Sequence, residues 1–71
     1  MTTSHLIETF KTETAASFRA ANLTERFKHE DAANQAAEKI IDLADSGDAE
    51  ADQFVGAMLS TVEAIRKAAI A

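Results

Sequence analysis

The chain contains no cysteine, proline, tryptophan or tyrosine, and only two glycines among its 71 residues. The absence of cysteine excludes disulfide bonds and the cysteine-based zinc sites. The absence of proline and the scarcity of glycine remove the residues that interrupt helices most strongly. Aromatic residues, which favour strands, make up only 6% of the sequence. These absences leave a chain that is compatible with helix at almost every position.

Long hydrophobic runs are absent as well, since no apolar stretch approaches the ~20 residues that span a bilayer. The first ten residues, MTTSHLIETF, lack the basic start and the continuous apolar stretch of a secretory signal. No cysteine is present to indicate an oxidising compartment. We therefore expect a cytoplasmic protein that does not associate with membranes.

Sixteen alanines and the even spread of larger apolar residues predict an all-α protein, with residues 1–71 forming a single small helical domain. A domain of this length buries only roughly 60% of the surface that its unfolded chain exposes, so it is marginally stable alone. Because disulfides are excluded and metal ligands are poor, self-association is the expected reinforcement. We predict a dimeric helical bundle, with a homodimer as its unit.

Three helices are predicted. The first covers about 4–21 after a hydroxyl cap at Thr3 or Ser4, and Asn22 then either bends it or starts a new helix. The second covers about 24–44, and the third about 49–70. Between them, Gly47 suits the positive φ that ends a helix, and Asp48 suits an N-cap. So short a connection predicts an antiparallel helical hairpin, against which the first helix folds in the same chain or in a second subunit.

The third helix carries the clearest pattern, because six apolar residues follow one another at alternating steps of four and three. They are Ala51, Val55, Met58, Val62, Ile65 and Ala69. This spacing places them on one face of a helix, where they form a dimer or core seam. We expect this seam to face the small residues at 33, 36, 37 and 44 of the second helix, since large and small residues pack densely together.

Residues 43–51 (LADSGDAEA), with Gly56 and Met58 following, resemble the helix-turn-helix junction of Sel1-type, tetratricopeptide-like repeats. The resemblance covers about 16 residues and implies a tight turn between two helices. Such repeats recur at a fixed period and stack in several copies, whereas no segment of this chain repeats at about 30 to 40 residues. The resemblance therefore concerns the turn and not the architecture.

Catalytic and metal-binding patterns are missing. His5 and His29 are the only imidazoles and belong to no metal-binding motif, and the serines lack the setting that activates a nucleophile. We expect no enzyme activity, no cofactor and no metal. The net charge of −5 argues against nucleic acid, because phosphate contacts require a basic surface.

The acidic residues are concentrated in the middle of the chain, where residues 31–52 carry seven acidic side chains and only one basic side chain, Lys39. They include Asp45 and Asp48 at the tip of the predicted hairpin. Most simply, these carboxylates keep the turn solvated and complement the N-terminal dipole of the third helix. Alternatively, they form a docking patch for a basic partner, or bind a divalent cation weakly.

Gly56 lies within the third helix but off its seam, where it costs about 1 kcal/mol relative to alanine. With Ser60 and Ala64 it forms a second, smooth track of small residues at steps of four. Either an exposed glycine is tolerated there, or another helix packs on the track: the first helix, a second subunit or a target.

These patterns predict a non-enzymatic protein–protein interaction module that occupies a partner's surface as an accessory regulator, inhibitor or escort chaperone, of the kind that bacteria and their phages encode. Phe18, Phe27 or Phe54 would be the aromatic anchors. One alternative is a small-molecule sponge, with a pocket between subunits where Arg19, Arg26, Lys28 or Arg66 binds an anionic ligand such as a nucleotide. A structural, self-assembling subunit is the other alternative.

Overall fold

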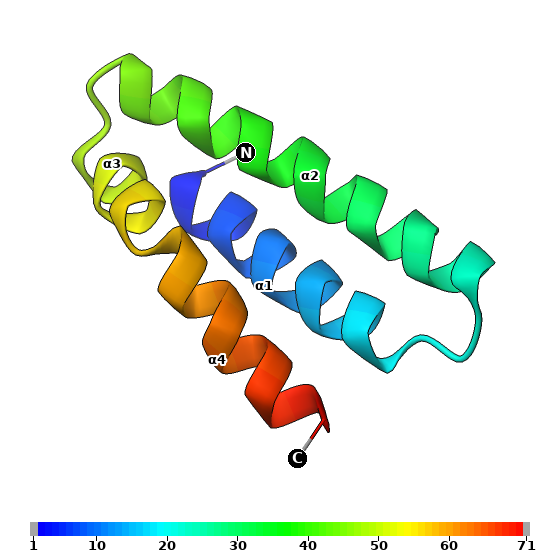
Figure 1. Ribbon diagram of the computed structural model, residues 1–71. Coiled ribbons are helices and arrows are strands. Elements are labelled where there is room, and N and C mark those ends of the chain that lie inside the picture. Colours follow the sequence, from blue (N-terminus) through cyan, green and yellow to red (C-terminus); the bar gives the residue numbers. More distant parts are fainter. Residues whose placement is uncertain (1, 71) are drawn as a thin grey trace.

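A computed structural model describes residues 2–70 and contains four helices in this range, with no strand. They are α1 (Thr3–Arg19), α2 (Leu23–Asp45), α3 (Ala49–Gly56) and α4 (Met58–Ile70) (Figure 1). The predicted all-α class is therefore confirmed. No helix within residues 2–70 is both long enough and apolar enough to cross a bilayer.

The first two helix starts follow from local capping chemistry. The Thr2 hydroxyl accepts a hydrogen bond from the His5 amide at 3.1 Å, so α1 begins slightly earlier than predicted. The Asn22 Oδ1 atom accepts from the Glu25 amide at 2.9 Å and starts α2. The chain is extended at Ala20 and Asn22, which confirms the predicted interruption and excludes a continuous helix.

The turn between α2 and α3 also has the predicted chemistry. Gly47 takes a φ of 98°, a left-handed conformation in which a side chain is strained. Asp48 then caps α3, because its Oδ1 atom accepts a hydrogen bond from the Ala51 amide at 2.9 Å. Both roles predicted for these two residues are confirmed.

The predicted single helix over 49–70 is wrong, because the chain breaks at Ala57. There φ is −106° and ψ is 6°, and the Ala57 amide donates to the Phe54 carbonyl at 3.0 Å. The helix resumes at once, since the Thr61 amide donates to the Ala57 carbonyl at 2.9 Å. Gly56 precedes the break, and its low helix propensity makes an interruption inexpensive at this point.

The predicted hairpin of residues 24–44 against 49–70 does not form along its length. Within the described chain, no Cα atom of α2 lies within 8 Å of a Cα atom of α4. Instead α1 lies between α2 and α4 and packs against both, while the short α3 contacts α2 and α1 (Figure 1). The first helix thus folds back in the same chain and takes the position that the hairpin prediction assigned to α4.

The core is a single small cluster made by α1, α2 and α3. Its buried apolar members are Leu6, Phe10, Ala33, Ala36, Ile40 and Ala51. The small alanines of α2 therefore share a core mainly with the large side chains of α1. No residue of α4 is buried, although Met58 and Val62 pack partly against the cluster. The predicted homodimer stays a prediction.

Candidate functional site

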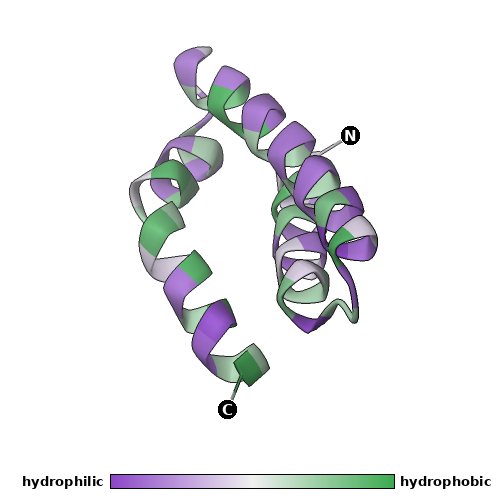
Figure 2. Ribbon diagram, turned by 45° about the vertical axis from the view of Figure 1, so that its right-hand side comes forward, coloured by the Kyte–Doolittle hydropathy of each residue, from purple (hydrophilic) through white to green (hydrophobic). Residues whose placement is uncertain are grey.

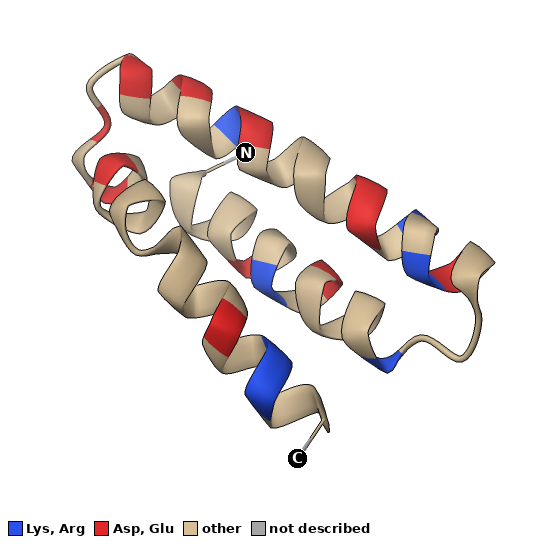
Figure 3. Ribbon diagram, viewed as in Figure 1, with Lys and Arg blue, Asp and Glu red and all other residues tan. Residues whose placement is uncertain are grey.

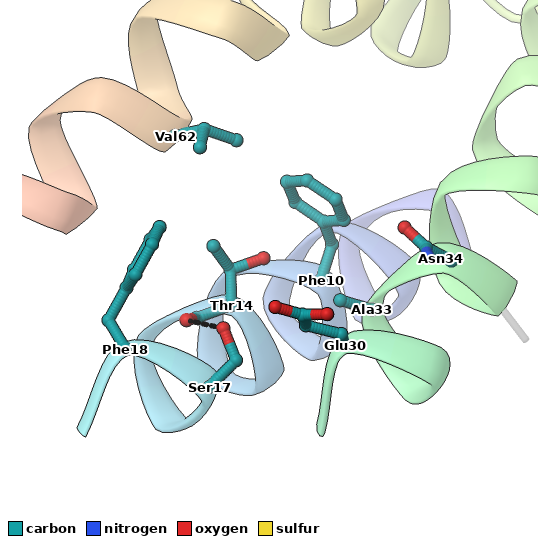
Figure 4. A pocket seen from close by; sticks show the side chains of 8 residues that line it. All are labelled: Phe10, Thr14, Ser17, Phe18, Glu30, Ala33, Asn34 and Val62. Carbon is teal, nitrogen blue, oxygen red and sulfur yellow. Dashed lines mark hydrogen bonds between the residues drawn. The ribbon is translucent and has the colours of Figure 1, made fainter. Parts of the chain in front are cut away.

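The side of the molecule between α2 and α4 contains a hollow of about 240 Å³. Its floor belongs to α1, and its walls belong to α2 and α4. The lining residues are Phe10, Thr14, Ser17 and Phe18 of α1, Glu30, Ala33 and Asn34 of α2, and Val62 of α4. Figure 4 shows Phe10 and Phe18 extending from α1 into the space that Val62 faces from α4. We call this feature the α2–α4 groove.

The groove exists because the chain turns twice before α4 begins. The three-residue connection after Asp45 and the eight-residue α3 carry the chain away from α2, and the break at Ala57 then redirects it. α3 contacts α2 at one end of the groove. Further along the described chain, α4 contacts α1 but not α2, so the hollow lies above α1 with α2 on one side and α4 on the other.

One stripe of α2 passes through two residues that line the hollow. Glu30 and Asn34 line the hollow, and continuing from them in steps of three and four defines what we call the α2 rim. It comprises Leu23, Phe27, Glu30, Asn34, Glu38, Ile41 and Asp45. Its three large apolar side chains are unusually open, with 65% of Leu23, 59% of Phe27 and 41% of Ile41 exposed.

A matching stripe runs along α4. Starting from Val62, which lines the hollow, steps of three and four define the α4 rim: Leu59, Val62, Arg66 and Ile70. Leu59 is 85% exposed and Ile70 is 65% exposed. Figure 2 shows apolar residues recurring along both helices. All five exposed large apolar side chains within residues 2–70 therefore lie on a stripe of α2 or α4 that continues from a residue lining the hollow.

The residues of the predicted seam do face inward, but the part on α3 belongs to a helix that contacts both α2 and α1, and, within residues 2–70, the part on α4 belongs to a helix that contacts α1 and not α2. Ala51 is buried in the core, and Val55, Met58 and Val62 pack against it in part. Ile65 and Ala69 are half-buried further along α4. The seam is consequently divided between α3 and α4, and in this chain it supports the position of α4 on α1.

The three predicted aromatic anchors occupy different environments. Phe18 lies in the floor of the groove and Phe27 on its α2 rim. Phe54 packs edge-on against Phe10, with ring centroids 5.7 Å apart and an interplanar angle of 80°. Phe54 therefore serves the core, and only Phe18 and Phe27 belong to the groove.

Gly56 and Ser60 are exposed on the surface. A Cβ atom added at Gly56 would meet nothing within 4 Å. Helix α1 is therefore not seated on the predicted track of small residues. The track is an open surface next to the break at Ala57.

The two acidic residues predicted at the tip also differ. Asp45 is exposed at the end of the α2 rim. Asp48 accepts hydrogen bonds from the Ala51 amide and from the Thr3 hydroxyl, the latter at 2.8 Å, and these bonds lower the pKa of its carboxyl below the ordinary range. Nearby, the Ser4 hydroxyl donates to Glu50 at 2.9 Å. Asp48 thus fastens α3 to the start of α1 and is committed to the fold.

A side-chain contact between α1 and α2 was not predicted from the sequence. The His29 Nδ1 atom lies 2.6 Å from a Glu13 oxygen, and its Nε2 atom lies 4.0 Å from a Glu25 oxygen. Sixteen residues separate His29 from Glu13, so only the packing of the two helices brings them together. The contact is half-buried and links α1 to the first half of α2.

Within residues 2–70, no three His, Asp or Glu side chains gather into a group that could hold a metal ion. None of the residues proposed for an anionic ligand, Arg19, Arg26, Lys28 and Arg66, lines the hollow, although Arg66 belongs to the α4 rim. Arg26 pairs with Glu30 at 2.9 Å and Arg66 pairs with Glu63 at 3.0 Å. Because Glu30 is the charged residue that lines the hollow, the groove itself disfavours an anion.

The rim residues Leu23, Ile41, Leu59 and Ile70 were missed at the sequence level. Each lies off the regular seam, and their common signal is a second apolar stripe beside the inward face. That signal is weak in a sequence, because isolated exposed apolar residues are ordinary.

Comparison with known proteins adds no relative, since no family model, curated protein or solved structure matches the chain.

Proposed function

We propose that the chain is a non-enzymatic protein–protein interaction module that binds an amphipathic helix of another protein in the α2–α4 groove. One observation carries this proposal: the five exposed large apolar side chains all lie on the helical stripes that pass through Glu30 and Asn34 of α2 and Val62 of α4, which line the hollow. Scattered exposed apolar residues are ordinary, but residues gathered around one hollow are typical of an interaction site.

The geometry suits the recognition mode in which an amphipathic helix lies in an apolar groove. The floor supplies Phe10 and Phe18, while the rims supply side chains on both sides. Covering these side chains removes apolar surface from water, which stabilises a complex by about 25 cal/mol per Å² before the cost of association. The aromatic rings of Phe18 and Phe27 would be the natural anchors.

In this role the protein would act by occupying a surface of its partner, as an accessory regulator, inhibitor or escort chaperone. The small size and the absence of catalytic groupings in the sequence favour such a role. A bacterial or phage accessory protein is the source that we consider most consistent with that size and composition.

Self-association through the same rims is a second candidate, in which the chain is a homodimer or a self-assembling subunit. The exposed surface is 4717 Å². For a folded monomer of 7.6 kDa, the area scaling gives ~4,300 Å². The excess of roughly 400 Å² is about half of what one partner buries in an ordinary interface. A small-molecule sponge is less well supported, because Arg26 and Arg66 are paired with glutamates, Arg19 and Lys28 do not line the hollow, and Glu30 does.

The proposal is tested with a synthetic amphipathic helix of about four turns, with leucines on one face and glutamines on the other. Titrated into the isotopically labelled protein, this peptide should shift the backbone amide signals of residues that line the groove. A Phe27→Gln, Leu59→Gln double variant should lose the response. A Thr12→Gln variant, altered at an exposed position of α1, should keep it.

Light scattering over a dilution series separates the second candidate from the first. A constant monomer mass together with peptide-induced shifts at the groove supports the helix-binding function. A dimer that dissociates in the double variant assigns the rims to self-association. Peptide-induced shifts spread over the whole surface, or no shifts from a monomeric protein, would overturn the proposal.

A further inference from the structure

We infer that the helix bound in the α2–α4 groove is basic along one flank, so that its lysines or arginines meet the α2 rim while its apolar face enters the groove. This inference rests on the proposed function and adds the chemistry of the partner. It comes from the charges that lie between the apolar residues of the rim.

The α2 rim alternates apolar and acidic side chains. Glu30, Glu38 and Asp45 lie among Leu23, Phe27 and Ile41 on the same stripe, and no basic residue belongs to it. Figure 3 shows acidic residues spaced along α2 as far as the turn into α3. A helix that covers the apolar side chains of this rim therefore passes close to three carboxylates.

The basic residues near the rim neutralise only part of it. Arg26 pairs with Glu30 at 2.9 Å, whereas within residues 2–70 neither Glu38 nor Asp45 forms an ion pair. Lys39 points away, since it lines hollows on the other side of the molecule with Leu6. On the α4 rim, Arg66 is paired with Glu63. The groove consequently combines an apolar floor with a predominantly acidic border.

Charge complementarity at the edge of an apolar interface selects partners and orients them. A second copy of this chain brings its own acidic α2 rim and a net charge of −5, so its approach meets repulsion. Nucleic acids and anionic membrane surfaces are repelled for the same reason. A basic amphipathic helix meets both requirements, because its apolar face matches the floor and its flank matches the rim.

The test uses three peptides that share one leucine face and carry lysine, glutamine or glutamate on the polar face. The lysine peptide should bind about tenfold more tightly than the glutamine peptide, since each exposed ion pair contributes modestly. The glutamate peptide should bind most weakly. The advantage of lysine should largely disappear at about 0.5 M salt, because exposed charges are then screened.

A charge-reversal pair locates the preference on the rim. Glu38→Lys should remove most of the difference between the lysine and glutamate peptides. Glu8→Lys changes the net charge equally but lies at an exposed position of α1 outside the groove lining, so it should preserve the difference. Circular dichroism of both variants checks that the helices are intact.

The outcomes separate the inference from the proposed function. If the glutamine peptide binds the groove and lysine brings no advantage, the inference is overturned and the groove still binds helices. If Glu8→Lys abolishes the preference as strongly as Glu38→Lys, net charge acts instead of the rim, and the inference also fails. If none of the peptides shifts the groove amides, the proposed function itself is overturned.

Discussion

Ile40 and Ile41 are neighbours in α2 with opposite environments, since Ile40 is fully buried whereas Ile41 is 41% exposed on the α2 rim. Removing one methylene from a core side chain loses its transfer free energy and leaves a small cavity. We expect Ile40→Val to lower the free energy of unfolding by about 1 kcal/mol, measured by urea denaturation.

Ile41→Val provides the matched control, because the same methylene is removed from a partly exposed side chain. Its effect should stay within about 0.5 kcal/mol. Equal losses in the two variants would contradict the assignment of Ile40 to the core and Ile41 to the rim.

Asp48 gives the fold a dependence on pH. Hydrogen bonds from the Ala51 amide and the Thr3 hydroxyl lower the pKa of its carboxyl in the folded state. The corresponding stabilisation is fully present above the unfolded pKa of about 3.9 and is lost as the pH falls through the lower, folded value. We expect Asp48→Asn to lower the melting temperature at pH 7 and to lower it less at pH 3.

Asp52→Asn is the control for this experiment. Asp52 also lies in the first turn of α3, but within residues 2–70 its side chain forms no hydrogen bond. A melting temperature difference that persists unchanged to low pH in Asp48→Asn would mean that the carboxylate charge of Asp48 is unimportant to the cap.

The helix caps and the turn glycine could be predicted from the sequence because their interactions are local. The capping roles of Asn22 and Asp48 and the turn role of Gly47 each act within four residues of the residue's own position, and their chemistry identifies them. The contact between His29 and Glu13 could not be predicted in the same way, since it depends on how α1 packs against α2.

The two glycines have opposite conformational requirements, since Gly47 has a positive φ in a turn whereas Gly56 lies at the end of helix α3. Replacing each with alanine should therefore change stability in opposite directions. Gly56 ends α3 with open space around its missing Cβ, so Gly56→Ala should raise the free energy of unfolding by about 0.5 to 1 kcal/mol through helix propensity. Gly47 has a φ of 98°, so Gly47→Ala should lower it by about 1 to 2 kcal/mol.

Thermal and urea denaturation of both variants measure these effects. Destabilisation by Gly56→Ala would show that the break at Ala57 requires glycine before it. A neutral Gly47→Ala would contradict the left-handed conformation of the turn between α2 and α3.

Helix α4 should be the least protected of the longer elements. It contributes no buried residue, and within residues 2–70 no side-chain hydrogen bond or ion pair connects it to α1 or α2. Local opening has a low free energy where buried contacts are few. We expect the amides of residues 62–69 to exchange with deuterium faster than those of residues 33–40, measured by NMR. Equal protection would show that α4 unfolds only together with the core.

The elements themselves were largely predictable, but the course of the chain after α3 was not. The seam that includes Val55 and Met58 continues in register across Ala57, so periodicity gave no sign of the break. The seam also indicates which face turns inward without indicating the neighbouring helix. α1 and α2 can both supply an apolar surface, and the choice of α1 follows from packing over the whole chain.

For the whole molecule, the two functions proposed for the groove, self-association and helix binding, should depend on salt concentration in opposite directions. Self-association brings together copies that each carry a net charge of −5, so screening should strengthen it as salt rises from about 0.05 to 0.5 M. Binding of a lysine-flanked helix should weaken over the same range. Sedimentation velocity measures the first and fluorescence anisotropy of a labelled peptide measures the second.

If both equilibria changed in the same direction with salt, the acidic rim would not control access to the groove.

The groove itself could not be predicted from the sequence. Leu23 and Phe27, or Leu59 and Ile70, are separately ordinary surface residues in the sequence, and only the spacing of α2 and α4 around α1 makes them the borders of one site.

The break at Ala57 is the point about which α4 would rotate as a rigid helix. From this pivot α4 extends over 13 residues, a length of about 20 Å at 1.5 Å per residue. A rotation of about 6° at the pivot would move Ile70 by about 2 Å but leave the first turn of α4 almost in place. In the proposed helix-binding role, selectivity for the size of the partner's side chains should therefore be strict beside α3 and tolerant toward Ile70.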